Sequence, residues 1–279
     1  MPGYDLHAHS DRSDGTLSPA EEMRLAASRD LTGVALTDHD TFDGLEEAGA
    51  AAADLGLEFV PGIEFSAEHD GASLHILGYW VDPTDLDVEA ELLRLTATRL
   101  RRGELIVEKL RELGFDVTID RVREIAGGQA IGRPHIAQAM VEAGVVTEEK
   151  EAFDRYISDD GPAYVPKHAL RPLDALRLIG RAGGVCVLAH PGMWRDSDAV
   201  PDELIEEMAA GGMVGLEVNH PDHDGEMRER YAAIAERLEL LPLSSSDCHG
   251  DRFGRRMGQE RTDADTFSEL RHRAGHRPR

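Results

Sequence analysis

The chain has 279 residues, of which 41% are hydrophobic, and its formal net charge at pH 7 is −24. This length suits one large α/β domain, or a barrel that carries an insertion. The acidic balance argues against a binder of long nucleic acid, because such proteins neutralise phosphates with clustered lysine and arginine. A mean hydropathy of −0.38, without an apolar run of about 18 residues, argues against a membrane protein.

The first residues and the cysteines indicate a compartment. The opening segment, MPGYDLHAHS, lacks the charged and apolar regions of a secretory signal. Cys186 and Cys248 form neither a disulfide framework nor a CxxC pair. We therefore expect a cytoplasmic protein, and no feature of the sequence predicts an obligate protein partner.

The first part of the chain alternates predicted strands and helices. Ser18-Pro19-Ala20-Glu21 has the pattern of a capping box with proline at the first helical position. A second helix is predicted around 45–55 and ends at Gly56. The predicted strands of this part lie near 4–6, 34–36, 58–64 and 73–80.

At Val81-Asp82-Pro83 the pattern becomes helical. Leucine, isoleucine and valine recur at helical spacing over residues ~86–113. We interpret 84–168 as a helical insertion that forms one wall of the substrate site, within a barrel made of 1–83 and 169–279. Further helices of the insertion are predicted around 118–126, 133–143 and 147–158.

From Arg171 onwards, strands and helices alternate again. Predicted strands at 185–190, 214–219 and 241–246 bring the total to seven, one short of the common eight-stranded barrel. The predicted helices of this part lie around 172–182, 201–210, 225–239 and 263–273.

Histidine and carboxylate side chains follow the ends of these predicted strands. A parallel barrel gathers its strand ends on one face, so residues scattered along the chain converge there. The sequence thus predicts a metal-dependent hydrolase. The residues concerned are His7, His9, Asp38, His39, Glu64, His75, His190, His220, Asp247 and His249.

Two pairs among these residues share a spacing of two. His7 and His9 form one pair, and Asp247 and His249 form the other. Alternate residues of a strand face the same side, as two ligands of one metal must. Cys248 should therefore point the other way, and we interpret it as a packing residue.

Simpler interpretations exist for several of these positions. Asp14, in the loop after the first strand, suits a turn or a helix cap, and His75 suits a hydrogen-bonded core histidine. Glu64 is harder to explain in this way, because its neighbours are apolar and a buried carboxylate needs a partner. A cation is one such partner.

Six motifs of the chain resemble those of the polymerase and histidinol phosphatase (PHP) phosphoesterases. They are DLHAHSDRSDG, LTDHDT, GIEFS, LHILGY, LAHPG and SSDCHG, in the family's order and over essentially the full length. The chain looks most like the small stand-alone TrpH/YciV type, including a helical insertion with Arg133-Pro134-His135. The resemblance implies an α/β fold, a distorted (β/α)7 TIM-like barrel with a helical insertion domain.

The resemblance also implies two to three divalent metal ions. Nitrogen and oxygen ligands without thiolate suit Mn, Fe or Zn. Glu64 would bridge two of the ions. The implied ligands are His7, His9, Glu64 and Asp247 for the first ion, Glu64, His75 and His190 for the second, and Asp14, His39 and His249 for the third.

The implied reaction is the hydrolysis of phosphate esters. Clustered cations lower the pKa of a bridging water, and the resulting hydroxide attacks phosphorus. His220 is a candidate general acid and substrate contact, with a loop-start histidine as the alternative. Arg133, His135 and Lys167 are candidate phosphate contacts, and surface ion pairing is the alternative for Arg133 and Lys167.

In the resembled type, such residues contact a second phosphate. The expected substrate is therefore a 3′,5′-bisphosphorylated nucleotide, or the 5′ end of a short RNA or DNA oligonucleotide. A histidinol-phosphate phosphatase would share the metals but not the substrate pocket. A zinc hydrolase of C–N bonds typically has a strand-end lysine, which this chain lacks. A non-catalytic PHP binding module tends to lose ligands, whereas all nine ligand-type residues are present here.

Overall fold

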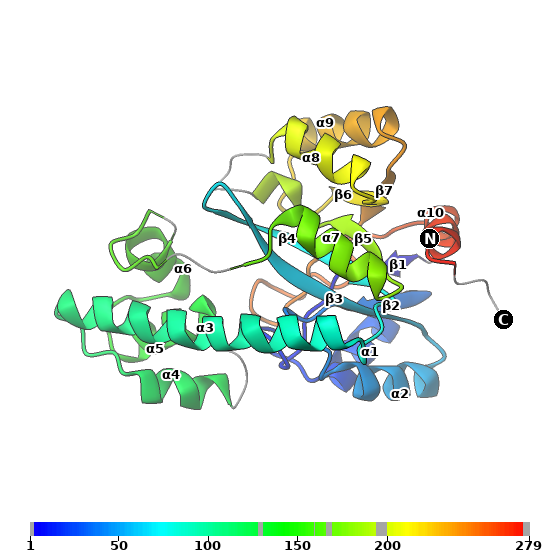
Figure 1. Cartoon of the computed structure of the whole chain (residues 1–279). Coiled ribbons are helices and arrows are strands. Elements are labelled where there is room, and N and C mark those ends of the chain that lie inside the picture. Colours follow the sequence, from blue (N-terminus) through cyan, green and yellow to red (C-terminus); the bar gives the residue numbers. More distant parts are fainter. Residues whose placement is uncertain (1–2, 128–130, 159, 166–168, 194–199, 276–279) are drawn as a thin grey trace. The chain divides into compact units, whose positions relative to one another are not determined.

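Seven strands form one sheet in the order β1 to β7 in a computed structural model of the chain (Figure 1). The structure describes residues 3–127, 131–158, 160–165, 169–193 and 200–275. The strands are β1 (Tyr4–Asp5), β2 (Gly33–Leu36), β3 (Glu58–His69), β4 (Ala72–Tyr79), β5 (Val185–Leu188), β6 (Gly215–Asn219) and β7 (Leu241–Ser244).

Helices separate most of the strands within the described residues. They are α1 (Pro19–Ser28), α2 (Leu45–Leu55), α3 (Leu86–Glu112), α4 (Ile119–Ala126), α5 (Arg133–Glu142), α6 (Glu149–Ala152), α7 (Pro172–Arg181), α8 (Asp202–Ala210), α9 (Gly225–Arg237) and α10 (Ala264–Arg273). The predicted helix at 147–158 is α6 continued by a π-helix, Phe153–Ile157. None of the helices described is long and apolar enough to cross a membrane.

The predicted start and end signals of the first helices are confirmed. The Ser18 hydroxyl accepts a hydrogen bond from the Glu21 N–H, and the Glu21 carboxylate accepts one from the Ser18 N–H. Gly56 ends α2 in the left-handed conformation, with φ of 69°. These caps fix where α1 and α2 begin and end, and both helices then pack into one core cluster with β2.

The predicted seven-stranded barrel fold is confirmed, but one strand runs against its neighbour. β1, β2 and β3 pair in parallel, as do β5, β6 and β7, whereas β4 pairs antiparallel with β5. A two-residue turn, Asp70-Gly71, joins β3 to β4, and both residues have positive φ, as a tight hairpin requires. The prediction that these side chains follow the ends of strands is wrong for Glu64 and His75, which lie inside β3 and β4.

The beginning of the chain meets the segment that follows β7. Ala8 and Cys248 form a parallel bridge outside the named strands, in which the His9 N–H donates to the Cys248 carbonyl. Each bridge residue is flanked on both sides by candidate ligands. The bridge therefore brings two distant pairs together: His7, His9, Asp247 and His249.

The chain divides into two compact units. One comprises 1–69, 73–89 and 170–279 and contains the seven-stranded sheet. The other comprises 70–72 and 90–169 and has a core of its own. Buried residues of that second core include Ile106, Leu110, Val122, Ile136 and Met140.

Candidate metal centre

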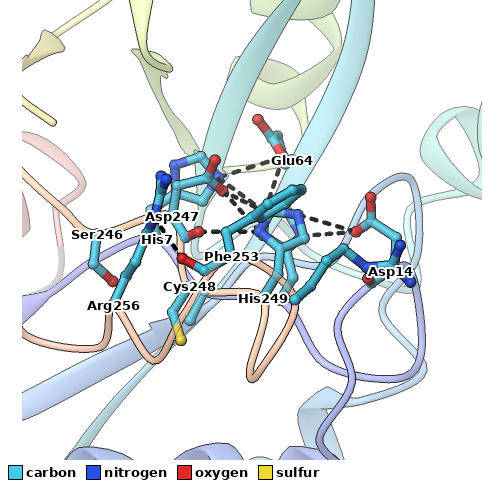
Figure 2. Close-up of polar contacts among 12 residues, drawn as sticks. His7, Asp14, Glu64, Ser246, Asp247, Cys248, His249, Phe253 and Arg256 are labelled. Carbon is cyan, nitrogen blue, oxygen red and sulfur yellow. Dashed lines mark hydrogen bonds and ion pairs between the residues drawn. The ribbon is translucent and has the colours of Figure 1, made fainter. Parts of the chain in front are cut away.

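Four buried or largely buried side chains meet in a first group (Figure 2). His7 Nε2 lies 3.0 Å from His9 Nε2 and 3.3 Å from Asp247 Oδ1. His9 Nε2 lies 3.2 Å from the same Asp247 oxygen and 3.1 Å from Glu64 Oε2. Four atoms that can each donate an electron pair thus approach one another closely.

Neighbouring residues determine which nitrogen of each ring carries a proton. His7 Nδ1 lies 3.0 Å from a Glu217 oxygen, to which it donates. The Ser13 hydroxyl donates to Asp38 at 2.6 Å, so its oxygen is an acceptor for His9 Nδ1 at 3.5 Å. In the neutral rings, both Nε2 atoms therefore carry a lone pair instead of a proton.

The two carboxylates of the first group complete this arrangement. Glu64 Oε2 and Asp247 Oδ1 are buried and form no hydrogen bond with any described residue. Buried carboxylate oxygens normally have hydrogen-bond partners, and each one without a partner requires an explanation. Ligand atoms of His7, His9 and Asp247 all lie within 4.8 Å of one another, so the residues present suit a metal ion.

A second group forms around the other oxygen of Glu64. Glu64 Oε1 lies 3.0 Å from His75 Nδ1 and 3.1 Å from His190 Nε2. His75 comes from β4, and His190 follows β5. Because its two oxygens face different sets of histidines, Glu64 has the geometry of a bridging carboxylate.

A third group contains Asp14, His39 and His249. The Nδ1 of His249 donates to the Asp247 carbonyl at 3.0 Å, which leaves a lone pair on Nε2, 3.3 Å from Asp14 Oδ1. His39 Nε2 lies 3.8 Å from Asp14 Oδ2, whereas its Nδ1 lies 3.0 Å from Glu64. His39 thus lies between two groups, which the motifs alone did not indicate.

The structure brings all nine predicted ligand-type residues together. Their donor atoms form four overlapping sets that could each hold a metal ion. These sets are His9/Asp14/His39/His249, His7/Glu64/His190, His7/His9/Asp247 and His39/Glu64/His75. Cys248 is buried in the core cluster of α1 and β2, and Figure 2 shows its sulfur turned away from the dashed contacts.

The charges of this centre favour a cation within it. Burial lowers the pKa of His9, but the nearby carboxylates of Asp247 and Glu64 outweigh burial and raise that pKa to about 10. Burial likewise raises the pKa of Asp247, but His249 and His7 hold it well below its usual range. The group therefore holds positive charge strongly, and a divalent ion can take the place of the protons.

Asp38 supports the loop that carries His9 and Asp14. Its carboxylate accepts from the Ser10 N–H at 2.7 Å, from the Ser10 hydroxyl at 2.6 Å and from the Ser13 hydroxyl. A Cβ on Gly15 would lie 2.2 Å from the His9 carbonyl oxygen, so only glycine fits there. Asp38 therefore has a supporting role.

Asp5 supports the loop that carries Asp247. It accepts from the Ser246 N–H at 3.0 Å, from the Ser246 hydroxyl at 2.5 Å and from the Gly258 N–H at 2.7 Å. Burial raises the pKa of Asp5 to about 6, although these hydrogen bonds act in the opposite direction. Asp5 lies two residues before His7 in the DLHAH motif, and the motif alone did not indicate its supporting role.

Two more residues that sequence reasoning missed lie beside the centre. Glu217, inside β6, contacts His7, and the charge of His7 outweighs burial to lower the pKa of Glu217 to about 2. His223 donates from Nδ1 to the Val218 carbonyl and accepts the Gly192 N–H at Nε2. The only sequence signal for Glu217 is a carboxylate within an apolar strand.

His220 is buried and turned towards the first group. Its Nδ1 accepts from the Asp222 N–H at 3.2 Å, so the proton of the neutral ring is on Nε2. That Nε2 lies 3.7 Å from Asp247 Oδ2. The ring therefore holds a proton beside the candidate ligands.

The remaining predicted residues belong to the second unit. Arg133 donates to the Ile157 carbonyl at 3.3 Å and stacks over Phe153. His135 is largely buried, and its Nδ1 accepts the Gly132 N–H at the start of α5. Lys167 lies outside the described residues.

The chain is similar to known proteins over most of its length. Residues 5–156 match the PHP domain. The chain is 35% identical over 257 residues to a 3′,5′-nucleoside bisphosphate phosphatase of Chromobacterium violaceum, covering 92% of this chain and 90% of that protein. It is 33% identical to a 5′-3′ exoribonuclease of Haemophilus influenzae, covering 88% and 89%.

A solved structure shares the whole fold. This candidate metal-dependent phosphoesterase from Bifidobacterium adolescentis matches with a TM-score of 0.92 and 36% identity, covering 98% of this chain and 96% of that one. The matches to phosphate-ester hydrolases extend over nearly the full length, and the histidine and carboxylate groups could bind metal. The chain therefore belongs to the PHP domain family and is a hydrolase of phosphate esters.

Proposed function

We propose that the chain hydrolyses 3′,5′-bisphosphorylated nucleotides, or phosphoesters at the 5′ ends of short RNA or DNA, with two to three divalent ions of Mn, Fe or Zn. The observation that supports the proposal is the convergence of histidine Nε2 atoms with buried carboxylate oxygens that make no hydrogen bond among the described residues. The similarity to a nucleoside bisphosphate phosphatase and to an exoribonuclease supports the substrate class.

The ligands follow from the three groups. Glu64 would join the first two positions, because its oxygens face different histidines. Divalent ions held there would lower the pKa of water and neutralise phosphate oxygens. We assign His7, His9, Glu64 and Asp247 to the first position, Glu64, His75 and His190 to the second, and Asp14, His39 and His249 to the third.

His220 is the proposed general acid for the leaving alcohol, because its Nε2 faces the first group, 3.7 Å from Asp247 Oδ2. It would donate as the imidazolium, in which Nδ1 no longer accepts the Asp222 N–H. His220→Gln should lower kcat for a nucleotide roughly 100-fold or more. The loss should be small for p-nitrophenyl phosphate, whose leaving group needs no proton. Equal losses on both substrates would instead indicate that His220 only positions Asp247.

Arg133, His135 and Lys167 would contact the second phosphate. Arg133→Ala and Lys167→Ala should each raise KM for a bisphosphate more than KM for the matching monophosphate. His135 is the weakest of the three candidate phosphate contacts, because its Nδ1 already accepts the Gly132 N–H. An equal rise of KM for both substrates would remove the second-phosphate role.

Composition also supports a substrate size and a cellular compartment. A net charge of −24 supports small phosphorylated substrates over long nucleic acid. The free, buried cysteines Cys186 and Cys248 support a reducing compartment, the cytoplasm. We propose no obligate protein partner.

The first test is Mn-supported phosphate release from adenosine 3′,5′-bisphosphate, beside histidinol phosphate and a short 5′-phosphorylated RNA. His9→Ala removes a nitrogen of the first group and serves as the blank. Turnover of the bisphosphate or the RNA, absent in the variant, supports the proposal. Preference for histidinol phosphate overturns the substrate assignment, and silence on all three with metal bound favours a non-catalytic module.

A further inference from the structure

Glu217 is a fully buried carboxylate in the middle of β6, and both of its oxygens are used. Oε1 lies 3.0 Å from His7 Nδ1. Oε2 accepts the backbone N–H of His190 at 2.6 Å. One side chain thus contacts a residue that follows β1 and a residue that follows β5, which are 183 positions apart in the sequence.

The two contacts differ in whether the group opposite Glu217 can change from donor to acceptor. A backbone N–H can only donate, so the atom opposite the His190 N–H must be an acceptor. A neutral imidazole can carry its proton on either nitrogen, and the hydrogen bond at one nitrogen decides the state of the other. An acceptor at His7 Nδ1 therefore places the lone pair on Nε2, where it faces His9 and Asp247.

The ligand rings reflect this common support. The imidazoles of His7 and His190 stack with their centroids 5.6 Å apart and their planes within 19°. His7 faces Glu64 through Nε2, and His190 does so through its own Nε2. The Glu217 carboxylate thus contacts the imidazole of His7, a candidate ligand of the first metal position. It also contacts the backbone N–H of His190, a candidate ligand of the second position.

We propose that Glu217 is a positioning residue that sets the metal-binding tautomer of His7 and aligns His190, so that one carboxylate supports two metal positions. This inference rests on the proposed function, because it takes His7 and His190 as metal ligands. Partners that orient metal-bound histidines typically change metal affinity 10- to 100-fold when they are removed.

Glu217→Gln gives a specific test, because an amide offers one acceptor and one donor where the carboxylate offers two acceptors. The amide oxygen must turn to the His190 N–H, so the NH₂ group faces His7 Nδ1. That nitrogen then has to accept, and the ring proton moves to Nε2, where it blocks the first metal position. We expect Mn affinity to fall about 10- to 100-fold at the first position and to stay near the wild-type value at the second.

Glu217→Ala removes both acceptors and should weaken both positions. Free Mn²⁺, measured by electron paramagnetic resonance during titration, gives the affinity and number of sites for each variant. ¹⁵N NMR of the zinc-loaded protein gives the state of His7, with the signal assigned by a His7→Gln variant. Wild type should show a zinc-bound Nε2 and a protonated Nδ1, and the zinc-bound signal should be lost in Glu217→Gln.

Glu22→Gln is the matched control. Glu22 is equally buried, but its side chain contacts the Cys248 sulfur at 3.8 Å instead of a candidate ligand nitrogen. Its Mn titration should equal that of wild type. A loss in Glu22→Gln as large as that in Glu217→Gln would show a general effect of removing a buried carboxylate, and would overturn the assignment.

Two outcomes separate this inference from the proposed function. Wild-type affinities and a zinc-bound His7 Nε2 in Glu217→Gln overturn the positioning role and leave the reaction intact. Equal losses at both positions in the Gln and Ala variants also overturn it, because only the Gln variant keeps an acceptor for His190. Metal binding that follows the expected pattern without any phosphate release supports the positioning role and overturns the proposed reaction.

Discussion

Glu22 shows what a buried carboxylate costs when no cation compensates it. It lies on α1 with no exposed surface, and its Oε1 makes no hydrogen bond with the described residues. Burial, together with the negative charge of Asp38, raises the pKa of Glu22 to about 8. By contrast, histidines hold the pKa of Glu64 well below its usual range in spite of burial. The two residues differ in their surroundings and not in their depth.

The pH dependence of stability follows from Glu22. Its folded pKa of about 8 exceeds the ordinary value of 4.5, so unfolding releases a proton and stability falls as pH rises between these values. Glu22→Gln should raise Tm by several degrees at pH 9 and hardly change it at pH 5. Thermal unfolding at both pH values checks this. The same Tm difference at both would show that titration of Glu22 is not the cause.

At this scale the sequence predicts the candidate ligands better than their supports. His7, His9 and Asp247 stand out because imidazole and carboxylate groups recur at a spacing of two. Asp5 and Glu217 do not stand out, because a carboxylate in a strand has the same letter whether it meets a serine, an imidazole or a backbone N–H. Such partners lie far away in the sequence and become visible only in the fold.

At the scale of the elements, the boundaries of strands and helices could be predicted from the sequence, but the direction of β4 was not predicted. Most predicted strands and helices agree with the structure to within a few residues, because capping residues and apolar periodicity are local. The direction of β4 depends instead on its link to β3. Parallel strands need a connection of a dozen or more residues, and Asp70-Gly71 is far too short. The reversal of β4 could therefore have been predicted from this turn.

The loop after β5 gives a prediction for one element. A Cβ on Gly192 would lie 2.8 Å from His223 Cδ2 and 2.9 Å from Met227 Sδ. Gly192→Ala should push His223 off the Gly192 N–H and shift His190, with about a 10-fold loss of Mn affinity. Metal titration and Tm measure the effect.

Gly180→Ala is the control for this loop, because nothing lies within 4 Å of a Cβ added at this glycine in α7. Alanine is favoured over glycine within a helix by roughly 0.5–1 kcal/mol, so this variant should be as stable as wild type or more so. Unchanged Mn affinity in Gly192→Ala would show that the His223 contact does not position His190.

The charge of the whole molecule predicts an unusual dependence on substrate length. With a net charge of −24, the protein should repel a long polyanion, and salt screens that repulsion beyond about 10 Å at 0.1 M. KM for a roughly 20-nucleotide 5′-phosphorylated RNA should therefore fall as NaCl rises, more than KM for a dinucleotide. Initial rates over a salt series measure both. A KM for the long RNA that rises steeply with salt would indicate a basic groove instead.

The bridge between Ala8 and Cys248 has a consequence for biosynthesis. His7 and His9 leave the ribosome first, whereas Asp247 and His249 leave it only after the second unit and the last strand have been made. Translation proceeds at about 5–20 residues per second, so the early histidines wait for their partners through most of synthesis. The first group is therefore incomplete on a nascent chain, and a metal ion at this group would be selected only by the folded protein. A metal ion bound there would also link the segment after β1 to the segment after β7.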